Sequence, residues 1–154
     1  MRLALLLAAL AVLGGMAYIR LAPSDPARWH RITSTVGDRS GAVSGRDPVQ
    51  MVAGSAHAAV TLAGIAPGAA LARLDAVALA TPRTTRLAGS PEEGSITWVT
   101  RSAIFGFPDY TTAVAHQDGP DTILTLHARQ RFGRRDFGVN AARLRDWIAR
   151  LTHD

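Results

Sequence analysis

The feature that most constrains this chain is an uninterrupted apolar run at its N-terminus, from Leu3 to Ile19. It contains no charged residue. Its length is at the short end of the range of about 17–25 residues that a membrane-spanning helix needs. Arg2 precedes the run and Arg20 follows it. We therefore predict a transmembrane anchor over residues 1–22.

A cleaved signal peptide is the alternative to an anchor, because Gly15 and Ala17 offer small residues before Tyr18. The sequence lacks a clear A-x-A cleavage site and its apolar run continues through Ile19, which favours the anchor. A run so close to the N-terminus usually acts as an export signal, so we expect the domain behind it on the periplasmic side of a bacterial inner membrane.

Residue usage removes several kinds of chemistry. The chain has no Cys, which excludes disulfides, thiolate metal sites and cysteine nucleophiles. It has no Lys, which excludes a Walker lysine and a Schiff-base lysine. The sequence also contains no G-x-S-x-G or G-x-G-x-x-G motif and no histidine pair at metal-ligand spacing. We expect no catalytic site, no metal and no cofactor.

Charge is concentrated near the C-terminus. The excess of Arg over Asp between Arg129 and Arg150 equals the whole net charge of +5. Such a segment suits an anionic partner or lipid head groups. It lacks the interleaved aromatic residues of nucleic-acid platforms, so no nucleic-acid partner is expected.

The pattern behind the anchor predicts an α+β domain. Residues 23–56 are rich in Ser, Gly and Asp and predict a linker or irregular layer, and residues 57–154 form the domain. Helices are expected from Pro67 to about Ala80 and from an N-cap at Asn140 onward. Strands are predicted at 58–62, 84–87, 96–103, 109–116 and 122–132. The predicted fold is a two-layer sandwich, a three- to five-stranded antiparallel sheet with both helices on one face.

The last two strands should form a hairpin across Asp118-Gly119-Pro120-Asp121. If residue 117 pairs with 122, Thr112 pairs with His127. Along the second strand, Leu124, Leu126 and Ala128 then share a buried face, and His127 lies on a wetter one.

One stretch of sequence resembles a known family. Its motifs are Gly106-Phe107-Pro108-Asp109-Tyr110, the run from Arg129 to Asn140, and then Arg143 and Trp147. They are similar to a family of small bacterial and plant proteins called domain of unknown function number fourteen ninety-nine. The similarity covers roughly residues 67–151, and the segment RLAPSDPARWH resembles membrane-tethered members. The resemblance implies an architecture and no activity.

We predict that the domain binds an anionic small molecule, a lipid head group or an envelope protein. A guanidinium group would bind the anion, and Asp136 would orient it. The predicted site residues are Arg131, Arg134, Asp136, Asn140 and Asp109. Two alternatives remain open. One is a hydrolase that uses Asp109 and Asp136 as acid and base. The other is a small lipid-carrying relative of the helix-grip fold.

Overall fold

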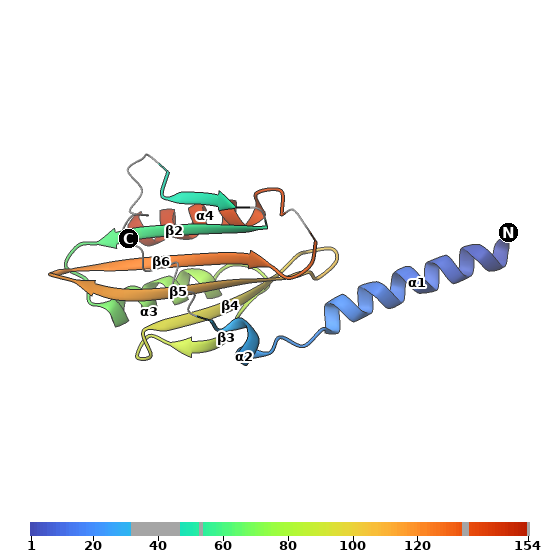
Figure 1. Cartoon of the computed structure of the whole chain (residues 1–154), viewed down its shortest axis with the longest axis horizontal. Helices are drawn as coiled ribbons and strands as arrows, with labels where there is room; N and C mark the ends of the chain where they lie inside the picture. Colours follow the sequence, from blue (N-terminus) through green and yellow to red (C-terminus); the bar gives the residue numbers. More distant parts are fainter. Residues whose placement is uncertain (32–46, 53, 134–135, 154) are drawn as a thin grey trace.

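The computed structural model describes residues 1–31, 47–52, 54–133 and 136–153. Helix α1 (Arg2–Leu21) extends away from the rest of the chain and buries none of its residues (Figure 1). Among the described residues, it is the one helix long and apolar enough to be a membrane span, and a signal sequence has the same properties. The predicted N-terminal apolar helix is therefore present.

The domain is built on an antiparallel sheet of six strands in the order β1-β2-β6-β5-β4-β3 (Figure 1). Six strands exceed the predicted three to five. The strands are β1 (Val49–Val52), β2 (Ser55–Leu62), β3 (Thr84–Ser90), β4 (Ser95–Arg101), β5 (Pro108–Asp118) and β6 (Asp121–Gln130). Strand β1 and the start of β2 lie in residues 47–56, where the sequence predicted no regular structure. Residues 32–46 of that predicted loop are outside the described part of the chain.

The hairpin of β5 and β6 has the predicted register, with Thr112 opposite His127 and Gln117 opposite Thr122. Gly119 adopts a φ of 59° in the turn, a conformation that glycine accepts without a steric penalty. The side-chain amide of Gln117 donates to the carbonyl oxygens of Gly119 and Asp121, each at 3.0 Å.

Helices α3 (Pro67–Leu79) and α4 (Val139–His153) pack against the sheet and against each other. Leu144, Trp147, Ile148 and Leu151 form the buried stripe of α4, and Leu71 and Leu74 of α3 are buried as well. Trp98 of β4 and Trp147 of α4 meet edge to face, with ring centroids 5.5 Å apart. Burying each large side chain of this kind contributes about 1.5–3 kcal/mol.

Register assigns the two faces of the sheet. Ala58, Leu126, Ala113 and Ile96 lie opposite one another across four strands, and all four belong to the core under the helices. The neighbouring row contains His57, His127, Thr112 and Thr97 and faces away from the helices. The predicted division of β6 into an apolar and a polar face is confirmed.

The segment after α1 packs on that second, polar face. Asp25 caps the short helix α2 (Pro26–Trp29) by accepting a hydrogen bond from the Ala27 amide at 2.9 Å. His30 Nδ1 is 2.9 Å from Thr97 Oγ1, and Trp29 stacks on Tyr110. Residues 22–30 are therefore held against the sheet.

The strand ends define two ends of the domain. The connections β1–β2, α3–β3, β4–β5 and β6–α4 lie together at the end that α1 enters, which we call the proximal end (Figure 1). The turns β3–β4 and β5–β6 and the connection β2–α3 lie at the opposite, distal end.

Candidate functional site

A largely buried ion pair joins β5 to α4 near the proximal end. Arg143 Nη2 lies 3.1 Å from Asp109 Oδ2, and the two side chains are only 9% and 16% exposed. Arg143 Nη1 donates to Asn140 Oδ1 at 2.8 Å. Asn140 is fully buried, and its Nδ2 has no hydrogen-bond partner among the described residues. The guanidinium group of Arg143 is thus held between two side chains.

Burial raises the pKa of the Asp109 carboxyl, because the charged form loses its hydration. The adjacent Arg143 guanidinium acts in the opposite direction, through its charge and its hydrogen bond. The negative charge of Asp136 is near enough to raise the pKa of Asp109 further. Arg143 is therefore the group that favours a charged Asp109 in this buried position.

Asp136 caps helix α4. Its Oδ1 accepts from the Gly138 amide and its Oδ2 from the Asn140 amide, each at 3.2 Å. The sequence predicted Asn140 as the N-cap, and this is corrected: α4 begins at Val139, so Asn140 lies in the first turn and its own amide is bound by Asp136.

The predicted site residues do not form one site. Asp109, Asp136 and Asn140 gather around the start of α4. Arg131 is on the other face of the sheet, where it donates to the Pro23 carbonyl at 2.8 Å and to the Tyr110 hydroxyl at 3.3 Å. Arg134 lies outside the described residues.

Arg131 belongs to a second group of charged side chains, which surrounds Trp29. The Trp29 ring stacks on Tyr110 with centroids 4.0 Å apart and planes 9° apart. The guanidinium carbons of Arg28, Arg129 and Arg131 lie 5.3, 5.7 and 6.0 Å from the centre of that ring. Arg129 Nη2 also donates to the Trp29 carbonyl. These are distances at which cations interact with an aromatic face.

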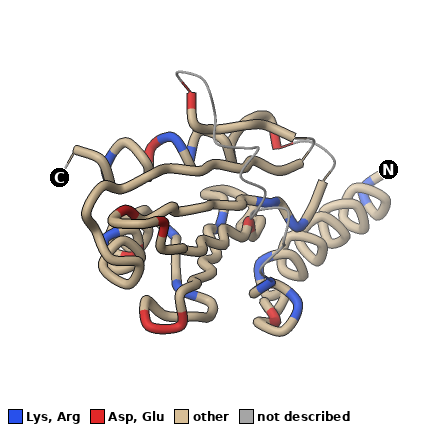
Figure 2. The backbone as a smooth tube through the Cα atoms, turned by 60° about the vertical axis from the view of Figure 1, so that its left-hand side comes forward, with Lys and Arg blue, Asp and Glu red and all other residues tan. Residues whose placement is uncertain are grey.

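Two further arginines extend this group toward α1. Arg20 Nη1 donates to the Ile104 carbonyl at 3.2 Å, and Arg101 Nη1 donates to the Gly106 carbonyl at 3.1 Å. We call Arg20, Arg28, Arg101, Arg129 and Arg131 the junction arginines. Figure 2 shows basic residues gathered where α1 meets the sheet.

The junction arginines differ from the arginines that form ion pairs in the described chain. Arg86, Arg143, Arg145 and Arg150 each pair with an Asp, whereas the junction arginines meet carbonyl groups and aromatic rings in the described part. Burial and the nearby charge of Arg31 both lower the pKa of Arg129, while Tyr110 acts in the opposite direction. An anion at this place would relieve repulsion among positive charges.

Sequence reasoning missed two parts of these arrangements. Arg143 was seen as part of the family motif and not as the partner of Asp109, from which it is 34 residues distant. The junction arginines come from segments about 100 residues apart, so only the fold brings them together. The one signal in the sequence for this group was Trp29, which has Arg28 just before it and Arg31 two residues after it.

Two histidines stack on the polar face of the sheet, His57 against His127, with ring centroids 4.1 Å apart. Burial lowers the pKa of both, and that of His127 reaches about 4 with the nearby charges of His57 and Arg129 adding to the effect. Both are therefore neutral near pH 7. Within the described residues, no three side chains of the His, Asp or Glu type gather as a metal site.

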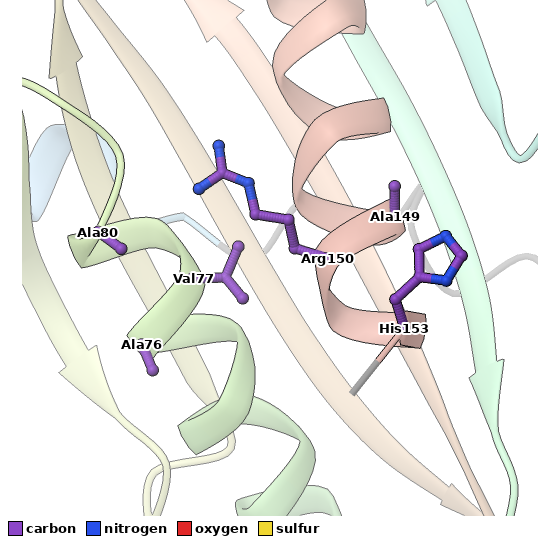
Figure 3. Close-up of a pocket in the computed structure, with 6 residues that line it drawn as sticks. All are labelled: Ala76, Val77, Ala80, Ala149, Arg150 and His153. Atoms are coloured by element: carbon purple, nitrogen blue, oxygen red, sulfur yellow. The ribbon is translucent and has the colours of Figure 1, made fainter.

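An open groove of about 520 Å³ runs between α3 and α4 (Figure 3). Ala76, Val77 and Ala80 line one side, and Ala149, Arg150 and His153 line the other. Arg150 is also engaged with Asp146. The groove is mostly apolar and offers few polar groups to orient a ligand.

A comparison with curated proteins finds no match to the chain. A family model described as "Protein of unknown function (DUF1499)" matches residues 20–151. The match includes Asp109, Asp136, Arg143 and the junction arginines. It joins the two stretches of similarity seen in the sequence, the segment RLAPSDPARWH and residues 67–151, into one match. The chain belongs to this family of proteins of unknown function.

Proposed function

We propose that this protein is a membrane-anchored, non-catalytic domain of the bacterial cell envelope that binds a phosphate or other anionic group at the junction arginines. The observation that carries the proposal is the group of guanidinium groups around Trp29, which meet no described carboxylate. Guanidinium groups bind phosphate and carboxylate oxygens through short, charge-assisted hydrogen bonds.

The place of this group favours a lipid head group as the anion. The junction arginines adjoin the end of α1, where the helix would leave a bilayer. Lipid phosphates lie at that depth, and Arg and Trp are typical of it. An N-terminal apolar helix of this kind serves as an export signal, so we place the domain on the periplasmic side.

The contacts of the carboxylates argue against the hydrolase alternative. Asp109 is engaged by Arg143, and both oxygens of Asp136 accept backbone hydrogen bonds. Neither is free to act as general acid or base without breaking a stabilising contact. The lipid-carrier alternative requires an enclosed apolar space between the sheet and α4, and the Trp98 and Trp147 rings fill that region.

The test is a titration of the full-length protein in neutral detergent with short-chain phosphatidylglycerol. Trp29 reports the binding, because the other two tryptophans, Trp98 and Trp147, are fully buried. We expect a saturable change in Trp emission that weakens as salt is added. Arg131→Gln should weaken the affinity about tenfold or more, since a hydrogen bond to a charged group is worth about 1.5–3 kcal/mol.

Arg145→Gln is the matched control, because Arg145 pairs with Asp47 away from Trp29. It should bind phosphatidylglycerol as the unaltered protein does. Equal weakening in both variants, or equal affinity for phosphatidylcholine, would contradict a specific anion site and would favour a protein partner instead.

A further inference from the structure

Exposed apolar side chains outside α1 collect at the proximal end of the domain. Ile104 and Phe105 lie in the β4–β5 connection, and Ile104 is 71% exposed. Phe137, 91% exposed, lies just before α4. In the described residues, the exposed large apolar side chains beyond α1 are Met51, Val52, Leu79, Ile104, Phe105, Phe137 and Val139. Every one of them is at a strand or helix end that the sheet register assigns to the proximal end.

The distal end has the opposite character. The β3–β4 turn carries Glu92 and Glu93, and the β5–β6 turn carries Asp118 and Asp121. Figure 2 shows acidic residues in turns on the side away from α1. The domain therefore has a basic, apolar end and an acidic end.

Phe137 lies in the turn ahead of α4, between Asp136 and the Gly138 and Asn140 amides that Asp136 binds. Its φ is 50°, in the left-handed region that costs a bulky residue steric energy. Its ring is nevertheless exposed, so core packing does not compensate for that cost. The hydrogen bonds of Asp136 hold this turn, and the turn presents the Phe137 ring to the outside of the domain.

The same end receives α1. Arg20, in the last turn of α1, donates to the carbonyl of Ile104, and the side chain of Arg20 lies against Gly106. Phe105, Phe107 and Phe132 form a row of rings from this connection toward the end of β6, with centroids 5.6 and 6.1 Å apart. If α1 spans a bilayer, the membrane surface lies near Arg20 at the end of that helix. Arg20 contacts the loop that carries the exposed Ile104 and Phe105.

We propose that the proximal end rests on the bilayer surface, with Ile104, Phe105 and Phe137 inserted at the boundary of head groups and acyl chains. The inference rests on the anchorage in the proposed function and does not depend on the anion site. Apolar residues rimmed by Arg are typical of interfacial membrane contacts, and the arginines match the charge of anionic lipids. The acidic distal end would then face away from the membrane.

A second copy of the chain fits this end less well. Two proximal ends facing each other would bring two sets of junction arginines together, and like charges repel. The tether at the same end also favours the bilayer, because it holds the apolar residues beside the membrane at all times.

The test uses spin labels on the full-length protein in vesicles of phosphatidylcholine with phosphatidylglycerol. The chain has no Cys, so a single introduced one is labelled uniquely. Ile104→Cys and Val139→Cys report the proximal end, and Asp118→Cys reports the distal end. We expect labels 104 and 139 to collide more with oxygen than with a water-soluble nickel complex, and label 118 to show the reverse.

The double change Phe105→Ser with Phe137→Ser should raise the nickel collisions of label 104 severalfold while leaving label 118 unaltered. Water exposure at 104 and 139 equal to that at 118 would overturn the proposal. Spin–spin broadening between copies at label 139 would overturn it in favour of a second copy. Repeating the measurement in phosphatidylcholine alone separates the two proposals: insertion that persists there supports docking even where the titration finds no anion site.

Discussion

At the scale of single residues, the pair of Asp109 and Arg143 makes the sharpest energetic prediction. Arg143→Ala leaves a buried carboxylate without its counter-charge, and breaking such a pair costs about 3–5 kcal/mol. We expect a loss of that order in the free energy of unfolding near pH 7. Chemical denaturation of the full-length protein in detergent, followed by Trp fluorescence, measures it.

Arg145→Ala is the control for this change, because its pair with Asp47 is solvent-exposed and should matter little. The double variant Arg143→Ala with Asp109→Asn should recover part of the lost stability, since the unpaired charge is then gone. A loss for Arg143→Ala no greater than for Arg145→Ala would refute the interpretation of a buried, coupled pair.

His127 predicts a dependence of stability on pH. Its pKa is about 4 in the folded protein, against an ordinary value of 6.5, because burial disfavours the charged ring. Between these two values the unfolded chain binds a proton that the folded chain does not. Stability should therefore fall as the pH is lowered from 6.5 to about 4, and thermal melts across that range measure the slope.

His127→Gln should flatten that slope, whereas His116→Gln, at an exposed position of β5, should keep it. The comparison between variants is needed because Asp109, with its raised pKa, contributes in the opposite direction: the folded chain binds its proton more readily. An unchanged slope in His127→Gln would mean that other groups control the acid response.

Residue by residue, the predicted site is divided between the two faces of the sheet. Asp109, Asp136 and Asn140 lie around the start of α4, whereas Arg131 lies near Trp29. The partner of Asp109 could not be chosen from sequence, because several Arg of the C-terminal segment were equally available. Only the packing of α4 across β2 and β6 brings Arg143 within reach of Asp109 on the next strand.

At the scale of elements, predictability followed the strength of local signals. The β5–β6 register could be predicted because a short Asp-Gly-Pro-Asp turn sets which residues face each other. Strand β1 could not, because it is a short edge strand whose side chains are mostly exposed and show no alternation. Strand β1 forms because it pairs with β2, and the sequence pattern of β1 alone does not reveal that contact.

The segment of residues 22–30 illustrates the same limit. Its Pro and Ser residues are typical of a linker, yet Trp29 and His30 attach it to the sheet. Tyr110, Arg129 and Thr97, which receive it, come from three different strands. A segment whose composition is typical of a linker therefore packs as a layer on the sheet.

At the scale of the whole molecule, this packed layer determines how the domain is placed relative to α1. Trp29 attaches it through the ring stacked on Tyr110 and the carbonyl bound by Arg129. Trp29→Ala removes the ring stack on Tyr110 while the backbone contacts stay, so it should loosen residues 22–30 and let the domain reorient more widely on its tether. Paired spin labels at Leu13→Cys and Asp118→Cys in the full-length protein would then show a broader distance distribution in vesicles.

Tyr18→Ala is the control, because Tyr18 is exposed on α1 and should leave the distribution narrow. A narrow distribution that survives Trp29→Ala would mean that the proximal contacts with lipid hold the domain by themselves. Combining Trp29→Ala with Phe105→Ser and Phe137→Ser decides that point. If the distribution broadens only in the combined variant, the attachment of residues 22–30 and the apolar end are redundant restraints on one orientation of the domain at the membrane.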